Sequence, residues 1–297
     1  MTDKRTDEAG GTEFRRVAEE LRARITDGGY PLGTFLPSQT TLAGEFGVSR
    51  DTVQRVLREL RGEGWIESRQ GRASRVVKGQ RIHSSAPRAT RSRHAMTLGP
   101  LIGEAFEQSD VSLDVYTLTS ESLDFHIHTQ AERIRNGAIT PRRIALRVVL
   151  PSATESPPYP RAKDPRDDAR LLERLRGITE RHTASLRKVL GELRAEKLVP
   201  SVEFEFRHAP LTPAFKLYVI NRAEVLHGPY IPVNRPMMLD TGEEVAGLDV
   251  LGLGATLTHH VRDSRPDSPG STFVASMTEW FEAVWELVTE EGRAARG

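Results

Sequence analysis

Apolar residues near the start of the chain recur at intervals of three or four, which is the period of an amphipathic helix. One such run extends from Phe14 to Ile25, a second ends at Phe46, and a third extends from Val53 to Leu60. Ser38 and Ser49 stand before the second and third runs, where a serine side chain can cap a helix. The pattern therefore predicts three helices, the last two joined by a tight turn at a glycine.

A break and two short polar-apolar stretches follow the third helix. Gly62-Glu63-Gly64 interrupts the helical period, and residues 65–69 and 75–77 then surround a Gln-Gly-Arg turn. Short strands on either side of a glycine turn are typical of a β-hairpin. We therefore predict a winged helix-turn-helix domain at residues 12–78, with the hairpin as its wing.

The outward positions of this predicted domain are polar and often basic. The guanidinium of Arg50 and the amide of Gln54 have the geometries that read guanine and adenine edges, and helix N-termini favour phosphate. Solvated helix faces also carry arginines, which is the simpler interpretation of Arg55 and Arg58. The residues expected to contact DNA are Ser38, Gln39, Thr40, Ser49, Arg50, Asp51, Thr52, Gln54, Arg55, Arg69, Gln70, Gly71 and Arg72.

The segment LPSQTTLAGEFGVSRDTVQRVLRELRGEGWIESRQGRASRVV resembles the DNA-binding domain of the GntR family of bacterial regulators. The resemblance implies that Ser49 and Arg50 begin the recognition helix, that Thr52 contacts a phosphate, and that Gly71 lies at the wing tip. The family usually has Glu-Arg where this chain has Gln39-Thr40, and usually has Arg in place of Gln54. We therefore expect an operator that differs from the common one of the family.

Charge is unevenly distributed along the chain. Residues 1–95 contain 18 Lys and Arg against 12 Asp and Glu, net +6, whereas the rest contain 24 against 29, net −5. Residues 78–95 hold five Lys or Arg and no acid, with no apolar period. We therefore predict a basic linker at residues 79–95 that acts as a tether or attracts DNA.

The remaining residues, 96–291, predict a second domain with helices and strands interleaved. A strand at 111–119, a helix at 125–135 and a strand at 144–150 form a β-α-β unit. A proline-rich loop follows, and the next elements are a long helix over 171–193, strands at 202–206, 215–220, 224–226 and 245–251, and a helix at 273–289. The fold class is therefore α+β multidomain, with a mixed α/β second domain.

The element order and the segment FKLYVINRAEVLHGPY resemble one half of a phospholipase D-like domain. That resemblance implies dimerisation through this domain and a His-x-Lys-x4-Asp motif, of which this chain retains Lys216 but has Ala214 and Asn221 at the flanking positions. Since alanine supplies no nucleophile, we expect no enzymatic activity. An anionic small molecule could pair with Lys216, and the candidate effector residues are Lys216, Tyr218, Asn221, His208 and Tyr116.

Other candidate chemistry is sparse. The chain has no cysteine, so disulfides and thiolate ligands are excluded. The pairs His126/His128 and His259/His260 lack the spacing of a metal site, and we expect neither a metal nor a cofactor. The cluster of Trp280, Phe281 and Trp285 is interpreted as core or dimer interface.

These features favour a homodimeric transcriptional regulator, with repression the usual outcome. Its expected partners are a palindromic double-stranded operator, a second copy of the chain and an unidentified small molecule. No run is apolar enough for a membrane span and no secretory signal is evident, so the expected location is the cytoplasm, in association with the nucleoid. Two alternatives stay open: a DNA-tethered phosphodiesterase or nuclease, and an architectural or plasmid-partition DNA binder without an effector.

Overall fold

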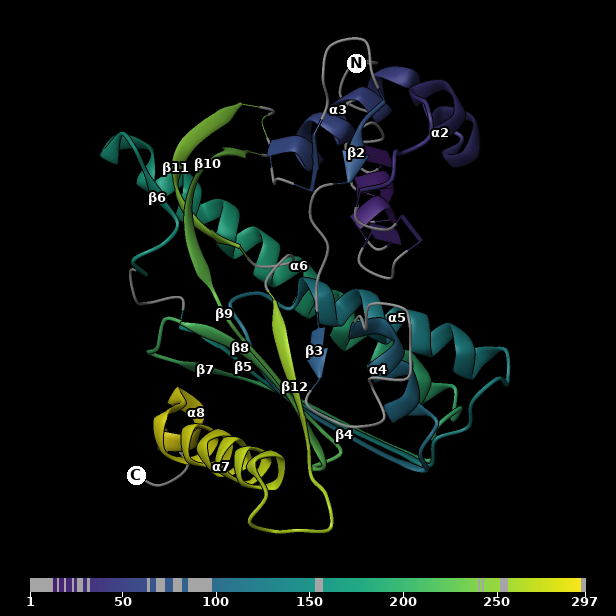
Figure 1. The fold of residues 1–297 in the computed structure, drawn as a ribbon, viewed down its shortest axis with the longest axis vertical. Helices are drawn as coiled ribbons and strands as arrows, with labels where there is room; N and C mark the ends of the chain where they lie inside the picture. Colours follow the sequence, from purple (N-terminus) through teal and green to yellow (C-terminus); the bar gives the residue numbers. More distant parts are fainter. Residues whose placement is uncertain are drawn as a thin grey trace.

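The chain folds into two domains, each with a hydrophobic core of its own (Figure 1). The computed structural model describes residues 13–14, 16–18, 20–22, 24–25, 29–30, 33–62, 65–67, 73–76, 82–84, 98–152, 157–239, 241, 243–251 and 256–294.

The N-terminal domain is built on two helices and a short hairpin. Helix α2 (Gln39–Phe46) and helix α3 (Arg50–Gly62) are joined at Gly47, whose φ of 65° lies in the left-handed region that favours glycine. Strand β1 (Ile66–Glu67) pairs antiparallel with β2 (Arg75–Val76). The core combines apolar side chains of all these elements with those of a preceding helical segment: Val17, Ala18, Leu21, Ile25, Leu36, Leu42, Ala43, Phe46, Val53, Val56, Leu57, Leu60, Trp65, Ile66 and Val76. The predicted helix-turn-helix and hairpin are thus present.

The C-terminal domain contains a seven-stranded mixed sheet in the order β3-β12-β9-β8-β4-β5-β7. Its strands are β3 (Ile82–Ser84), β4 (Asp110–Tyr116), β5 (Arg143–Pro151), β7 (Ser201–Ala209), β8 (Phe215–Ile220), β9 (Glu224–Pro229) and β12 (Leu257–Val261). Strands β4, β5 and β7 are parallel, whereas β8 is antiparallel to β4 and β9 to β8. The mixed α/β class predicted for this region agrees with this sheet.

Helices cover both faces of the sheet because the central strands are apolar on both sides. Helices α4 (Leu98–Phe106), α5 (Glu121–Arg135) and α6 (Asp168–Ala195) lie on one face (Figure 1). Helix α7 (Pro269–Ala283), the π-helical segment η3 (Val284–Val288) and α8 (Glu290–Ala294) lie on the other. Along β5, Leu146 and Val148 face the first group and Val149 the second.

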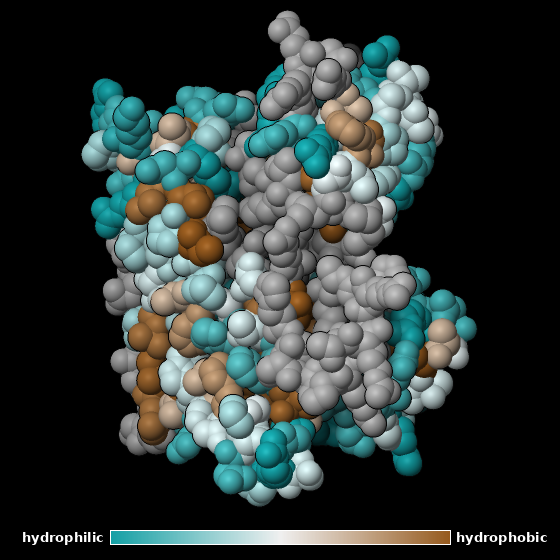
Figure 2. All heavy atoms as spheres, viewed as in Figure 1, coloured by the Kyte–Doolittle hydropathy of each residue, from teal (hydrophilic) through white to brown (hydrophobic). Residues whose placement is uncertain are grey.

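A smaller sheet extends from this domain toward the helix-turn-helix. Its strands, in the order β10-β11-β6, are β10 (Ile231–Met238), β11 (Glu244–Leu251) and β6 (Arg161–Ala162). A short 3-10 helix, η2 (Pro165–Asp167), follows β6 along the chain. The apolar side of this smaller sheet packs on α6, and β10 contacts α3. Hydrophobic atoms gather over this hairpin at the left of the view in Figure 2, where Ile231 is among the exposed apolar residues.

The structure differs from the predicted elements in several places. The segment 79–95 was expected to be a linker, yet its residues 82–84 form β3, which pairs in parallel with β12 and so belongs to the large sheet. Helix α4 and strands β10 and β12 were not predicted at all. Among the described residues, none of the helices has the length and apolar character that crossing a membrane requires.

Candidate nucleic-acid interface

The first turn of α3 is fixed by the residue that precedes it. The Ser49 hydroxyl accepts a hydrogen bond from the Thr52 backbone N at 3.0 Å and lies 2.9 Å from the Thr52 hydroxyl. Thr52 is only 6% exposed, so its side chain serves the helix cap. The contact of Thr52 with a phosphate stays a prediction.

Other predicted contact residues of α3 point to solvent. Arg50, Asp51, Gln54 and Arg55 are all exposed, and the Arg55 guanidinium lies 5.0 Å from the centroid of the Phe14 ring. Arg50 and Gln54 are four residues apart, so their side chains share one face of the helix. That face carries a guanidinium and an amide at the N-terminal end of a helix, which is the arrangement that reads base edges in a major groove.

Helix α2 precedes α3 along the chain, and its N-terminus is capped in the same way. The Ser38 hydroxyl accepts a hydrogen bond from the Thr41 backbone N at 3.1 Å. Gln39 is half-buried and Thr40 exposed at the first turn. The sequence thus correctly predicts both serine caps, and a capped helix N-terminus presents N–H groups that suit a DNA phosphate.

The wing is described only at its base. Backbone pairing of Ile66 with Val76 fixes the register of the hairpin. The Arg75 Nε donates a hydrogen bond to the Gly33 carbonyl at 3.0 Å, so this arginine is tied to the loop before α2. The predicted contacts Arg69, Gln70, Gly71 and Arg72 lie outside the described residues.

Arg22 connects the helix-turn-helix to the second domain. Its guanidinium hydrogen-bonds to Glu59 of α3, and its Nη1 lies 3.7 Å from Oε1 of Glu121, the first residue of α5. Together with the contact of β10 with α3, this ion pair connects the two domains. Among the described residues, Arg50 at the N-terminal end of α3 makes no ion pair.

A buried polar cluster lies at the same end of α5. Lys216 of β8 is only 3% exposed, and its Nζ lies 3.5 Å from the Ser122 hydroxyl and 5.8 Å from the centroid of the Tyr230 ring. Burial raises the pKa of Tyr218, and the Ser122 side chain partly offsets that shift. We call Lys216, Ser122, His126, Tyr218 and Tyr230 the Lys216 cluster.

Electrostatics and hydrogen bonds fix the protonation of this cluster. Burial, and then the charge of Lys216, lowers the pKa of His126 to about 3, so this histidine is neutral at pH 7. Burial raises the pKa of Tyr230, which keeps its hydroxyl protonated. That hydroxyl lies 3.0 Å from the Thr117 Oγ1 and accepts a hydrogen bond from the Leu118 N at 2.9 Å. The cluster therefore places the Lys216 side chain beside hydroxyl groups and a neutral imidazole.

The five candidate effector residues do not form one site. Lys216 and Tyr218 share the face of the sheet covered by α5, whereas Tyr116 faces α7 and packs 5.0 Å from the Trp280 ring. Asn221 has a φ of 50° and its Oδ1 accepts a hydrogen bond from the Ser112 N, so it shapes the turn after β8. His208 lies 3.1 Å from a carboxylate oxygen of Glu291. Alternate residues of a strand point to opposite faces, which separates these side chains.

Sequence reasoning missed three members of the Lys216 cluster. His126 and Ser122 come from α5, and Tyr230 directly precedes β10. The available signal was a histidine and serines on the apolar side of a helix, since Ser120, Ser122 and His126 are all buried. His128 lies on the exposed side, as predicted for residues two apart, and no group of three metal-ligating side chains occurs within the described parts of the chain. Trp280, Phe281 and Trp285 pack in one core cluster.

Comparison with known proteins places the match in the N-terminal domain. The family model described as "Bacterial regulatory proteins, gntR family" matches residues 14–76. The uncharacterized HTH-type transcriptional regulator RB1450 of Rhizobium meliloti (strain 1021) is 35% identical over 91 residues, which cover 31% of this chain and 36% of that protein.

Two further relatives are from Escherichia coli (strain K12). The Glc operon transcriptional activator is 41% identical over 71 residues, covering 24% of this chain and 28% of the relative. The mannosyl-D-glycerate transport/metabolism system repressor MngR is 39% identical over 70 residues, covering 24% and 29%. The match thus spans about a third of the length of these curated relatives. The N-terminal domain of this chain is therefore similar to the helix-turn-helix domain of gntR-family regulators.

Proposed function

We propose that this protein is a homodimeric, sequence-specific transcriptional regulator that binds a palindromic operator and responds to a small molecule. The observation that carries the proposal is the capped, solvent-facing N-terminus of α3, with Arg50 and Gln54 on one face. Relatives that share this domain are named as an activator and as a repressor. We favour repression by occlusion of a promoter.

A dimer follows from the symmetry of DNA recognition. One recognition helix reads only a few base pairs, and two helices related by a twofold axis read two half-sites about one helical turn apart. The C-terminal domain supplies the larger surface for pairing two chains. Its parallel strands and the buried Lys216 near the start of β8 support the phospholipase D-like resemblance of residues 96–291, which we keep as part of the proposal.

We place the effector at the Lys216 cluster and propose an anionic small molecule as its class. A buried ammonium beside hydroxyl donors can bind a carboxylate or a phosphate with charge-assisted hydrogen bonds. The cluster also adjoins the domain contact, because Ser122 follows Glu121, which pairs with Arg22, and Arg22 in turn bonds to Glu59 of the recognition helix. A ligand that displaces the start of α5 would therefore change DNA affinity, and by linkage DNA would change ligand affinity by the same factor.

Selection from a library of random duplexes by the purified full-length chain tests the DNA-binding part. We expect enrichment of one inverted repeat and a footprint that covers both of its halves. Absence of any enriched sequence would contradict specific DNA binding. Enrichment of a lone half-site would contradict the dimer and leave specific DNA binding intact.

A thermal-shift series tests the effector site. Inorganic phosphate, acetate, sugar phosphates and neutral sugars are compared on the wild-type chain and on Lys216→Met, which keeps the aliphatic stem. We expect an anion to raise the melting temperature of the wild-type chain and not that of the variant. An equal shift in both proteins would place anion binding elsewhere.

A further inference from the structure

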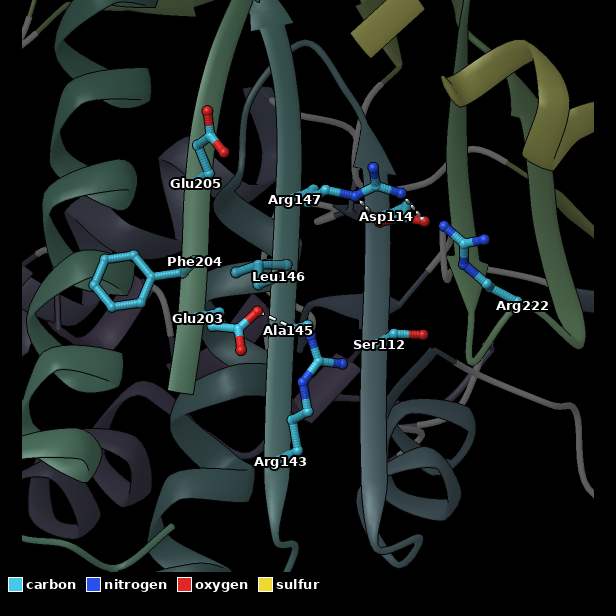
Figure 3. A pocket seen from close by; sticks show the side chains of 10 residues that line it. All are labelled: Ser112, Asp114, Arg143, Ala145, Leu146, Arg147, Glu203, Phe204, Glu205 and Arg222. Atoms are coloured by element: carbon cyan, nitrogen blue, oxygen red, sulfur yellow. Dashed lines mark hydrogen bonds and ion pairs between the residues drawn. The ribbon is translucent and has the colours of Figure 1, made fainter. Parts of the chain in front are cut away.

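One face of the seven-stranded sheet is only partly covered. Helix α7 packs against β12, β9 and β8, while η3 and α8 pack against β7. The first halves of β4 and β5 and the adjacent part of β7 are left with a shallow pocket of about 380 Å³ (Figure 3). Its lining residues are Ser112, Asp114, Arg143, Ala145, Leu146, Arg147, Glu203, Phe204, Glu205 and Arg222.

The floor of this pocket is rigid. Arg147 makes two hydrogen bonds to the Asp114 carboxylate, at 2.7 and 2.8 Å, and its guanidinium lies 5.2 Å from the Phe281 ring centroid. Asp114 is only 4% exposed. Sheets with parallel strands almost always have both faces covered by other elements. A patch over three parallel strands that no described element of the chain covers therefore indicates a surface that another molecule covers.

Charges on this patch alternate from strand to strand. The strand registers place Arg143 beside Asp110, and Arg147 beside both Asp114 and Glu205. We call the charged side chains that one strand presents on this patch a column. The column of β7 is acidic, that of β5 is basic, that of β4 is acidic, and the turn after β8 is basic. Their members are Glu203 and Glu205, then Arg143 and Arg147, then Asp110 and Asp114, and last Arg222.

We propose that a second copy of this chain covers the patch, face to face, with a twofold axis running along the strands between β5 and β4. This inference rests on the homodimer proposed above and names its surface. Such an axis reverses the order of the columns, so an acidic column meets a basic one at every position. Arg143 then faces the partner's Asp110, and Glu203 faces the partner's Arg222, while Asp114 and Arg147 stay paired with each other in the floor of each patch.

Charge complementarity selects this axis over the alternative. A twofold axis perpendicular to the strands would place each column on itself, and like charges would repel across the interface. Arg143 already bonds to Glu203 of its own chain at 2.8 Å, and Arg222 bonds to Glu282. A guanidinium has five N–H donors, so these arginines can serve one carboxylate in each chain.

The patch also leaves the proposed effector site accessible. The Lys216 cluster lies on the opposite face of the sheet and at the opposite end of β4, because Leu217 pairs with Tyr116 and Ile220 with Leu113. Dimer formation and ligand binding therefore use separate surfaces. The orientation of the two helix-turn-helix domains is then set by how the two sheets pack, with strands aligned to within about 30°.

Charge reversal with complementation between two variants tests the surface. Glu203→Arg and Arg222→Glu are purified separately as full-length chains, and their dimer dissociation constants are measured by analytical ultracentrifugation. Each variant alone places two like-charge pairs in its homodimer, so we expect its dissociation constant to rise by about tenfold or more. Mixed in equal amounts, the two variants form a heterodimer in which all these pairs are attractive, and we expect near wild-type affinity.

Rescue by mixing separates this interface from a folding defect, since a misfolded chain gains nothing from its partner. Glu173→Arg on α6, an exposed position away from the patch, is the matched control and should dimerise like the wild type. A wild-type dimer that neither reversal weakens would overturn this interface while leaving the homodimer itself intact. A wild-type chain that is monomeric throughout, even with operator DNA, would overturn both.

Discussion

The two domains use arginine in opposite ways. In the C-terminal domain, Arg147 is fixed by Asp114 and Glu282, and Arg235 pairs with Asp249. On the exposed face of α3, Arg50 makes no ion pair with any described residue and stands in solvent. The comparison shows that neutralised arginines belong to the framework, whereas an exposed, uncompensated arginine at a helix N-terminus is available for DNA. Overall basicity alone does not make this distinction.

The same division exists within the helix-turn-helix. Arg24, in the helical segment before α2, is held by Glu45 and Glu20, and these bonds raise its pKa further above the ordinary value. Arg22 is held by Glu59. The acidic residues of this domain thus compensate the arginines behind α3 and leave those at its N-terminus unpaired with carboxylates of the described residues.

The largest expected effect is on the stability of the C-terminal domain, where Arg147 is paired with carboxylates. Asp114→Ala leaves the partly buried Arg147 with one carboxylate fewer, and breaking a buried pair on one side costs about 3 kcal/mol. We expect the free energy of unfolding of the C-terminal domain, measured by urea denaturation, to fall by about that amount. DNA affinity of the folded fraction should be unchanged. A loss of DNA affinity without a loss of stability would contradict the framework role.

A pH titration of stability addresses the Lys216 cluster. His126 has a native pKa of about 3 against 6.5 in the unfolded chain, so unfolding takes up a proton between these values. Stability is therefore greatest above pH 6.5 and falls as the pH drops toward 3, by at most about 1.4 kcal/mol per pH unit. We expect His126→Gln to reduce this slope, measured by urea denaturation at several pH values. Equal slopes in the wild type and in His126→Gln would refute the assignment.

Loss of a helix cap is expected to reduce stability by a smaller amount, and to do so in the N-terminal domain but not in the C-terminal domain. Ser49→Ala removes the side-chain bond to the Thr52 N at the start of α3, and we expect a loss of about 1 kcal/mol in the stability of the helix-turn-helix. Ser120 precedes α5 but makes no capping bond with its side chain, so Ser120→Ala should cost little. Thermal unfolding followed by circular dichroism compares the two variants. Equal losses would mean that the cap at Ser49 has no special part in α3.

The smallest effect is expected at the domain contact. Glu121→Gln removes the charge that faces Arg22 at 3.7 Å, and a partly exposed pair of this kind contributes less than about 1 kcal/mol. We expect the two domains to unfold less cooperatively, measured by calorimetry, with little change in either domain alone. Glu107→Gln, which breaks a surface pair with Arg133 inside the C-terminal domain, should not change that cooperativity.

The sequence predicted elements well where one period of apolar residues was dominant. The caps at Ser38 and Ser49, helices α2 and α3, and strands β5 and β8 follow from local pattern. Strand β10 was missed because it contains Pro232 and Pro236, which the sheet tolerates since β10 is an edge strand. Helix α4 was missed for a similar reason, because it begins LGP, and β12 because it contains two histidines.

The exposed face at the start of α3 could be predicted and the Lys216 cluster could not. Contacts at the start of α3 lie within one helical turn, so spacing along the sequence is sufficient to place Arg50 beside Gln54. The cluster joins Ser122 and His126 of α5 to Lys216 of β8 and to Tyr230, which lie about a hundred residues further along the chain. Only the pairing of β8 with β4 brings them together, and that pairing has no local signal.

One pair of variants tests the central claim, that the exposed N-terminus of α3 reads DNA. Arg50→Ala is compared with Arg61→Ala, which removes an exposed arginine from the last turn of the same helix. Affinity for the selected operator is measured by fluorescence anisotropy at fixed salt. Loss of a base contact costs about 1 to 3 kcal/mol, so we predict that Arg50→Ala weakens operator binding by roughly 5-fold to 150-fold and that Arg61→Ala leaves it nearly unchanged. Undiminished affinity of Arg50→Ala would contradict the account.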